Sequence, residues 1–287
     1  MNRLKARLAA GETIKAAWAE LASPDAAEIM VRHGWDVIVI DGEHGVGGLE
    51  DWVAVARAVE AAGGEAVLRV PEGSDALLKR VLDRGFRSII VPMVNSARDA
   101  AAIAGACRYP PLGRRGYAAP VVRGSGFGTL PGYGAGAAAE DLLLIVQCEH
   151  ADAVADIAAL AGTDGVDMVF IGPNDLAGSM GLLEQLEAPA LHAAFEEVEA
   201  ATQAAGKWLG SITGPGLRAT LDHIGAVFPL IRHEVPSGTK VLDWEVPREW
   251  TPRAAKPAAA PLRPAKAWEE RDTDKRGRVK AVKPSAD

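Results

Sequence analysis

The sequence predicts a single (β/α)8 barrel, a TIM barrel, followed by a tail of low complexity. Apolar runs of strand length alternate with helical patterns along the first 245 residues, and this alternation is typical of a parallel sheet covered by helices. Eight strands can be counted, seven of them followed by a predicted helix, and a chain segment near 250 residues long accommodates such units as one closed (β/α)8 barrel. An open, doubly wound sheet is the alternative, but no glycine-rich dinucleotide fingerprint follows the first strong strand.

The strands are predicted where short apolar runs rich in Val, Ile and Leu end in polar residues or proline. They comprise residues 14–18, 35–40, 65–70, 88–91, 142–147, 168–171, 207–210 and 226–230. Each of the stronger runs is apolar on both faces, as expected for a strand that helices cover on one side and the barrel interior covers on the other.

The helices are predicted from their start and stop signals. A short amphipathic helix is expected ahead of the barrel, near the N-terminus. Ser23-Pro24 and Ser74 are typical helix starts, and Gly34 and Gly63 are typical helix ends. The predicted helices within the barrel comprise residues 25–33, 49–62, 74–84, 96–107, 151–160, 190–205 and 215–222. The non-periodic, glycine-rich segment 108–139 is long enough to suggest a functional loop.

The remaining 42 residues, 246–287, have a different composition. They are rich in Ala, Pro and Lys and carry 11 Lys/Arg against 6 Asp/Glu, which leaves 20 against 32 for residues 1–245. Such a segment buries too little apolar surface to offset its ordering entropy, so we expect it to be disordered or to drape over a partner subunit. A tail that docks on an anionic partner is the less favoured alternative.

The bulk composition excludes several classes of protein. The net charge of −7 does not favour binding to nucleic acid or to an anionic membrane, and no apolar run approaches the length of a membrane span. The N-terminus lacks the apolar core of a signal peptide. Cys107 and Cys148 form no disulfide or zinc spacing. We therefore expect a cytoplasmic protein with two free thiols.

Polar residues follow four of the predicted strands at the point where each strand ends. They are Asp41 and His44, Arg69, Gln147 and Glu149, and Asp175. In a barrel this end of the sheet is where enzymes carry their chemistry. Side chains alternate along a strand, so Gln147 and Glu149 face one side while Cys148 faces the other, as a packed core thiol.

Two of these residues have the chemistry of metal ligands. The Glu149 and Asp175 carboxylates at the ends of neighbouring parallel strands suit a hard, oxygen-liking cation. The alternative is structural, with Asp175 capping a short helix and Glu149 an ordinary surface acid. A Schiff-base mechanism needs a lysine at the same strand ends. Lys207 lies at the start of its predicted strand instead, which favours the metal.

Several short motifs resemble the HpcH/HpaI family of class II pyruvate aldolases, from about Thr13 to Gly225. They are DGEHG at 41–45, LRVP at 68–71, VPMVNSARDA at 91–100, RYPPLGRRG at 108–116, VQCE at 146–149 and FIGPNDLAGSMG at 170–181. The order and spacing of the family are kept. The combination of RYPP-x-G-x-RG with FIGP-x-DL is the most specific part of the resemblance.

The resemblance implies a site and a reaction. Glu149 and Asp175 would hold Mg²⁺, Mn²⁺ or Co²⁺, which polarises the 2-oxo group of pyruvate and stabilises its enolate. Arg69 would face the 2-oxo oxygen. His44, oriented by Asp41, would act as the base through a water. Binding of the substrate would be completed by Gln147 and by the amides near Asn174 and Asp175. From its position at the end of the first predicted strand, Trp18 is expected either to line the site floor or to fill the barrel interior. Family members cleave 4-hydroxy-2-oxo acids to pyruvate and an aldehyde.

Other interpretations of the same sequence stay open. Some relatives condense an oxo acid with an acyl-CoA, as in a citrate synthase, and a basic patch such as Arg232 with His233 would discriminate this activity. A catalytically silent barrel used for binding is a third possibility. The family also implies a homo-oligomer, for example a trimer of dimers. Arg123 lies in a loop that, in this family, helps to select the aldehyde.

Overall fold

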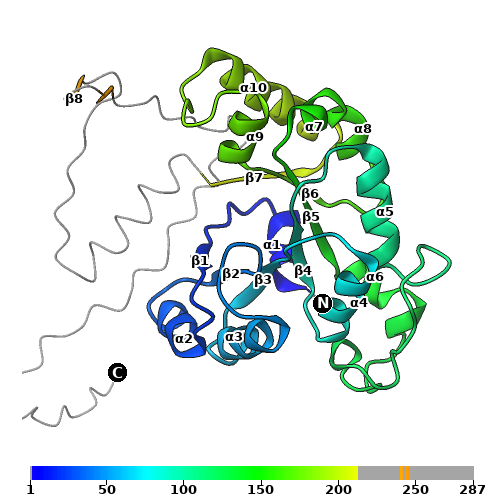
Figure 1. Cartoon of the computed structure of the whole chain (residues 1–287). Helices are drawn as coiled ribbons and strands as arrows, with labels where there is room; N and C mark the ends of the chain where they lie inside the picture. The colour runs from blue at the N-terminus through cyan, green and yellow to red at the C-terminus, as the bar shows by residue number, and fades with distance from the viewer. Residues whose placement is uncertain (1, 213–239, 242–243, 246–287) are drawn as a thin grey trace, which may run out of the picture. The chain divides into compact units, whose positions relative to one another are not determined.

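A computed structural model (Figure 1) describes residues 2–212, 240–241 and 244–245 of the chain. The chain divides into a unit of residues 1–257 and a unit of residues 258–287, and the second lies outside the described residues. The predicted strand 226–230, the predicted helix 215–222, Arg232, His233 and the tail 246–287 also lie outside them. The predicted boundary at residue 245 stays a prediction.

A seven-stranded parallel sheet forms the centre of the fold, in the order β1-β2-β3-β4-β5-β6-β7. Its strands are β1 (Ala17–Ala19), β2 (Val37–Asp41), β3 (Glu65–Arg69), β4 (Ser88–Val91), β5 (Leu143–Cys148), β6 (Met168–Ile171) and β7 (Trp208–Ser211). The sheet curls into a half-barrel with helices along its outer side (Figure 1). The predicted barrel is thus confirmed as a curled parallel α/β fold, and its closure by an eighth strand stays a prediction. A separate antiparallel pair joins β8 (Lys240–Val241) to β9 (Trp244–Glu245).

Most helices lie close to their predicted positions. The described helices are α1 (Arg3–Ala9), α2 (Pro24–Arg32), α3 (Leu49–Ala61), α4 (Asp75–Asp83), α5 (Ala97–Cys107), α6 (Ala137–Asp141), α7 (Ala151–Ala155), α8 (Ile157–Ala161), α9 (Pro173–Ser179) and α10 (Pro189–Ala204). Of these, α6 and α9 are not among the predicted helices. The prediction of one helix over 151–160 is wrong in one respect, because the segment forms two short helices, α7 and α8, that are separated at Asp156. The Asp156 carboxylate accepts a hydrogen bond from the Ala97 amide at the start of α5, so the break serves a neighbouring helix.

Side-chain alternation along the strands divides the core in two. Outward-facing residues such as Ile38, Ile40 and Leu144 pack under the helices in the larger cluster. Inward-facing residues form a second cluster in the hollow of the half-barrel. Its members are Leu4, Leu8, Val37, Val39, Val67, Ile90, Leu143 and Ile145. Because the period is two residues, the same inward face continues through the polar residues at the carboxyl ends of β2, β3 and β5.

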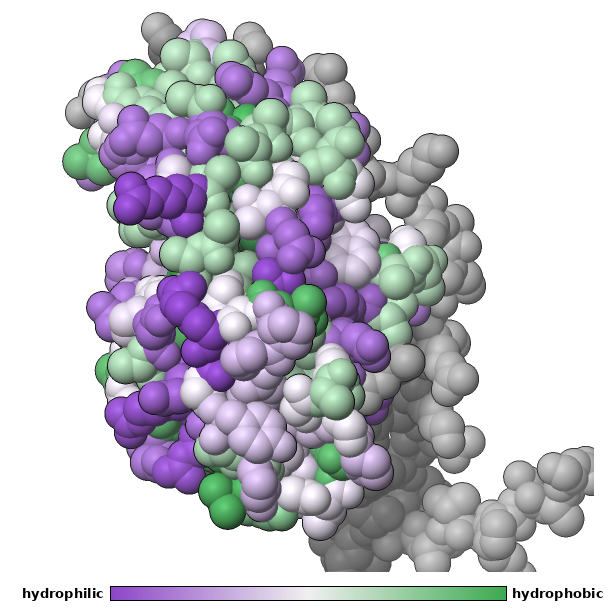
Figure 2. All heavy atoms as spheres, turned by 90° about the vertical axis from the view of Figure 1, so that its right-hand side faces the viewer, coloured by the Kyte–Doolittle hydropathy of each residue, from purple (hydrophilic) through white to green (hydrophobic). Residues whose placement is uncertain are grey.

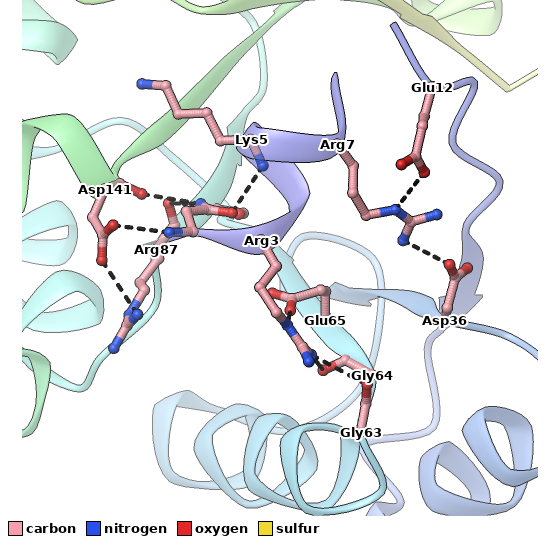
Figure 3. Close-up of polar contacts among 12 residues, drawn as sticks. Arg3, Lys5, Arg7, Glu12, Asp36, Gly63, Gly64, Glu65, Arg87 and Asp141 are labelled. Carbon is pink, nitrogen blue, oxygen red and sulfur yellow. Dashed lines mark hydrogen bonds and ion pairs between the residues drawn. The ribbon is translucent and has the colours of Figure 1, made fainter. Parts of the chain in front are cut away.

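The N-terminal helix α1 lies against the amino ends of the strands. Leu4 and Leu8 on one face of α1 belong to the inward-facing cluster. The polar side of α1 and its N-cap Asn2 make hydrogen bonds and ion pairs with the surrounding loops (Figure 3). The Asn2 side-chain amide, for example, donates to the Ser88 hydroxyl at 2.9 Å. The predicted lead-in helix is therefore confirmed, and it covers the end of the half-barrel opposite to the polar strand ends.

The long segment 108–139 contains two 3-10 turns, η1 (Arg123–Ser125) and η2 (Tyr133–Ala135), and the start of α6. Arg123 pairs with Glu60 at the end of α3 and donates to the Arg84 carbonyl after α4. Arg123 therefore points away from the polar strand ends of its own chain. The surface over α5 and this segment mixes hydrophilic and hydrophobic residues (Figure 2). None of the helices in the described ranges has the length and apolarity needed to cross a bilayer.

Candidate active site

The site is centred on a buried ion pair between two neighbouring strands. Asp41 ends β2 and Arg69 ends β3, and the two residues are direct partners in the sheet register. Arg69 Nε donates to Asp41 Oδ1 at 2.9 Å and Arg69 Nη2 donates to Asp41 Oδ2 at 2.5 Å. Both side chains are buried. Although burial opposes ionisation, the hydrogen bond from Arg69 holds the pKa of Asp41 below its ordinary value.

The Asp41 carboxylate also shapes the turn that follows β2. Its Oδ1 accepts hydrogen bonds from the backbone amides of Glu43 and His44 at 3.0 and 3.2 Å. At Gly45 a Cβ would lie 2.3 Å from the Asp41 carbonyl oxygen, so the tight turn requires glycine there. The DGEHG motif is thus a turn built around one carboxylate, which is the local structure that Asx residues favour.

The His44 imidazole makes a different contact from the expected one. The hydrogen bonds to the Asp41 carboxylate within the described residues come from Arg69 and from backbone amides, so orientation of the His44 imidazole by Asp41 stays a prediction. The imidazole is 66% exposed, and its Nε2 lies 3.8 Å from Glu43 Oε2. Glu43 also pairs with Arg69 Nη1 at 3.1 Å. Glu43 therefore links His44 to Arg69, and burial raises its pKa.

An aromatic side chain lies against the guanidinium. Trp18 lies in β1, and the Arg69 Cζ atom is 4.6 Å from the centre of its ring, within the range of a cation–π contact. The Trp18 ring also makes an edge contact with Phe170, with ring centres 6.3 Å apart. The predicted floor residue thus lies in the interior beside Arg69, where it restricts the orientation of the guanidinium.

Glu149 lies one residue beyond β5 and is 2% exposed. Its Oε1 accepts a hydrogen bond from the Met93 amide at 2.7 Å, and its Oε2 accepts one from Gln147 Nε2 at 2.6 Å. The Gln147 Oε1 atom is buried, with no hydrogen-bond partner among the described residues. Two neutral donors, the Met93 amide and the Gln147 side chain, therefore orient the Glu149 carboxylate. Among the described residues, no cationic side chain contacts this carboxylate directly.

The electrostatics of this carboxylate follow from its surroundings. Burial raises the pKa of Glu149 to about 7, and the negative charges of Glu43 and Asp175 act in the same direction. The Met93 hydrogen bond and the charge of Arg69 oppose this shift. Three carboxylates thus repel one another at the carboxyl end of the sheet, which is the electrostatic condition that a bound cation would relieve.

Two backbone features hold Glu149 in place. At Gly172, which follows β6, a Cβ would lie 2.3 Å from Glu149 Oε2, so only glycine allows this approach. Met93, which follows β4, adopts a left-handed backbone with φ 52°. That conformation costs a residue with a Cβ about 1–2 kcal/mol. Neither residue was predicted from the sequence, because each contact joins segments that are distant along the chain.

Asn174 and Asp175 lie in the first turn of α9, directly after Gly172, and both are exposed. Asp175 raises the pKa of both Glu43 and Glu149 through its charge, so it lies within electrostatic reach of them. The structure therefore brings Trp18, Asp41, Arg69, Gln147, Glu149 and Asp175 to one end of the sheet, as the strand pattern predicts. Lys207 precedes β7, and its Nζ donates to the Val166 carbonyl ahead of β6, at the opposite end.

The donor set suits a hard divalent cation with open positions. Within the described part of the chain, no group of three or more His, Cys, Asp and Glu side chains is arranged to hold a metal ion. Mg²⁺ is often bound by only one or two carboxylates, with water and substrate completing its coordination. Glu149 and Asp175 provide two carboxylates, and the uncompensated charge of buried Glu149 is an independent observation that fits a cation.

Comparison with known proteins places the chain in a family. The model of the HpcH/HpaI aldolase/citrate lyase family matches residues 15–214, and that of a domain of unknown function matches residues 207–280. A 4-hydroxy-2-oxovalerate aldolase of Novosphingobium aromaticivorans is 42% identical over 214 residues, covering 74% of this chain and 80% of the relative. A hydroxypyruvate/pyruvate aldolase of Agrobacterium fabrum is 40% identical over 212 residues, covering 74% and 79%.

Solved structures agree with this placement. A HpcH/HpaI aldolase/citrate lyase family protein from Burkholderia cenocepacia is 34% identical with a TM-score of 0.71, covering 78% of this chain and 90% of that one. A citrate synthase is more distant, at 27% identity and a TM-score of 0.66, covering 77% and 86%. The chain belongs to the HpcH/HpaI aldolase/citrate lyase family and is a lyase of the aldolase type.

Proposed function

We propose that the enzyme cleaves 4-hydroxy-2-oxo acids to pyruvate and an aldehyde with the help of a divalent cation, and that it catalyses the reverse addition. The observation that carries this proposal is the burial of Arg69 and Glu149 at the same end of the sheet. Asp41 fixes the Arg69 guanidinium, whereas the Glu149 carboxylate has no cationic partner in direct contact among the described residues. The names of the relatives, which refer to 4-hydroxy-2-oxovalerate and to pyruvate, support the substrate class.

Each side chain has a role that follows from its position. Glu149 and Asp175 would hold the cation, which would supply Lewis-acid polarisation of the 2-oxo group. The guanidinium of Arg69 faces the 2-oxo oxygen and stabilises the negative charge that develops there. Its orientation is fixed beforehand by Asp41, Glu43 and Trp18, so little reorganisation is needed during the reaction.

Bond cleavage requires a base at the 4-hydroxyl group. His44 accepts that proton, directly or through a water, and the carboxylate of Glu43, 3.8 Å away, stabilises the positive charge that the imidazole gains. The C3–C4 bond then breaks, the aldehyde departs, and the electron pair stays on the three-carbon fragment with its charge facing Arg69. Return of the proton from His44 to C3, directly or through the water, gives pyruvate. We assign Gln147 and the first turn of α9, with Asn174, to binding of the substrate carboxylate or its water.

Two alternatives are less favoured. A citrate-synthase-type condensation with an acyl-CoA needs a basic patch for the CoA phosphates, and its candidates Arg232 and His233 lie outside the described residues. A catalytically silent barrel is disfavoured because Asp41, Arg69 and Glu149 are retained together and held in place by hydrogen bonds. A homo-oligomer, including a trimer of dimers, is part of the proposal on family grounds, as is a location in the cytoplasm.

Deuterium exchange into the methyl group of pyruvate, followed by proton NMR, tests the proposal without knowledge of the aldehyde. We expect exchange with Mg²⁺ and none with a chelator. Arg69→Ala should slow it about a hundredfold, the usual effect of losing one donor to a developing oxyanion. Arg114→Ala is the matched control, because Arg114 makes the same two-point pair with Asp75 at the surface. Failure of the wild-type enzyme to exchange with bound Mg²⁺ would contradict the proposal.

A further inference from the structure

The residues that follow β4 carry an unexplained feature. Met93 holds a left-handed backbone, φ 52°, which L-residues with long side chains rarely adopt. Its amide donates to Glu149 Oε1 at 2.7 Å, and the next amide, that of Val94, donates to the Gln147 carbonyl at 3.3 Å. The two contacts fasten this turn to the carboxyl end of β5, so the unusual backbone aims an N–H group at the Glu149 carboxylate.

The core does not use the side chain of this residue. Met93 is 49% exposed, whereas Val91, Pro92 and Val94 around it are buried. Glycine would adopt the same backbone without strain, yet the chain carries a long, flexible thioether one hydrogen bond away from Glu149. Strained backbone at a functional site is retained where the surroundings enforce it and the site makes use of it.

The residues near Met93 indicate the chemistry of the substrate group that the Met93 side chain contacts. Exposed large apolar residues recur on the loops that follow the strands, namely Leu21 after β1, Val46 after β2, Met93 after β4 and Ile212 after β7. The one buried cation at this end among the described residues, Arg69, is already shared by Asp41 and Glu43. These residues thus favour an uncharged acceptor with an apolar substituent over an anionic one.

We propose that Met93 has two roles, both resting on the function proposed above. Its backbone amide is a positioning group that holds Glu149, and its thioether contacts the substituent of an uncharged, apolar aldehyde. Methionine suits the second role because it is unbranched and polarisable and adapts to different apolar shapes. The inference therefore names an acceptor class and the residue that selects it.

Acceptor choice is tested with propanal and glycolaldehyde, which differ by a methyl against a hydroxyl group. The kcat/KM for addition of pyruvate is measured with each aldehyde, and the ratio of the two values cancels any loss of activity common to both reactions. We expect Met93→Gly to lower the propanal-to-glycolaldehyde ratio about fourfold, the effect of one buried methylene, and Met93→Leu to restore it. An unchanged ratio in Met93→Gly would overturn the specificity role.

Positioning is tested with two branched-chain variants of similar polarity. Met93→Val places a β-branched residue at positive φ, which shifts the amide away from Glu149, while Met93→Leu is not β-branched. We expect Mn²⁺ affinity, measured by electron paramagnetic resonance, to fall about tenfold or more in Met93→Val relative to Met93→Leu, as for other lost outer contacts of a metal ligand. Thermal unfolding checks that both variants fold.

Equal Mn²⁺ affinity in the two variants would overturn the positioning role. The wild-type enzyme separates this failure from failure of the proposed function. If it exchanges pyruvate deuterium with Mg²⁺ while the variants behave alike, the Met93 inference alone is wrong. If it does not exchange at all, the proposed function fails and the acceptor role falls with it.

Discussion

The two ends of the parallel sheet use charge in opposite ways. At the amino ends of the strands, the basic residues of α1 each have an acidic partner. Lys5 pairs with Asp167 at 2.9 Å, and Arg7 pairs with Asp36 at 2.6 Å (Figure 3). At the carboxyl ends, Glu149 is buried beside other carboxylates and its pKa rises to about 7. One end is arranged for stability, while the other retains unfavourable interactions that a substrate and a cation can relieve.

Removal of the buried carboxylate should have the largest effect on activity. Glu149→Gln keeps the size of the side chain and its hydrogen bond from Met93, but removes the charge that holds the cation. We expect pyruvate deuterium exchange to fall by more than about a thousandfold, consistent with loss of metal catalysis. The free energy of unfolding at pH 7 should not decrease, because ionised Glu149 is disfavoured by burial. Retained exchange would rule out the metal assignment.

The opposite end should respond in the opposite way. Leu4 of α1 is 3% exposed in the inward-facing cluster, so Leu4→Ala should lower the free energy of unfolding by about 2–5 kcal/mol. Urea unfolding measures this, and exchange activity per folded molecule should match that of the wild type. The control is Leu112→Ala, where the leucine is 54% exposed and the expected loss is below about 0.5 kcal/mol. A large loss of exchange activity per folded molecule in Leu4→Ala would contradict the assignment of stability to the amino end and of catalysis to the carboxyl end.

The stability of the metal-free protein should depend on pH through Glu149. Its pKa is about 7 in the fold against an ordinary 4.5, so below pH 4.5 the group is neutral in both states. As pH rises from 4.5 to 7 the unfolded chain ionises it while the fold resists, and stability is lost. We expect a decrease of roughly 2–3 kcal/mol relative to Glu149→Gln, measured by thermal unfolding with a chelator. Parallel pH profiles for the two proteins would contradict this mechanism.

The smallest effect on the free energy of unfolding is expected from removing one arginine and its surface ion pairs at the amino end. Arg7 contacts Glu12 and Asp36 at 2.8 and 2.6 Å, but all three side chains are 30–55% exposed. Arg7→Ala should therefore lower the free energy of unfolding by less than about 1 kcal/mol, and by even less at high salt. Urea unfolding at two salt concentrations measures it. A loss above about 2 kcal/mol would mean that these pairs act as a network.

Local pattern predicts much of this arrangement. Strand alternation is a property of neighbouring residues, so the sequence alone is enough to group Asp41, Arg69 and Gln147 at one end of the sheet. The sequence does not show that the Arg69 side chain donates to the Asp41 carboxylate, because that contact spans 28 residues. The Met93 contact with Glu149 spans 56 residues. A left-handed methionine has no sequence signal of its own.

The fold shows the same limit. Caps and glycines predict most helix ends closely, since those signals are local. The break at Asp156 was missed because its cause is a hydrogen bond to α5, 59 residues away in the chain. Glu43 was missed as a site residue because its partners, Arg69 and His44, are selected by the folded turn.

A divalent cation held by Glu149 and Asp175 is the central element of the proposed chemistry, and Mn²⁺ titration followed by electron paramagnetic resonance measures it directly. We predict one tightly bound Mn²⁺ per chain in the wild-type enzyme and loss of that binding in both Glu149→Gln and Asp175→Asn. Wild-type binding that survives unchanged in both variants would contradict the assignment, because the cation would then lie elsewhere in the molecule.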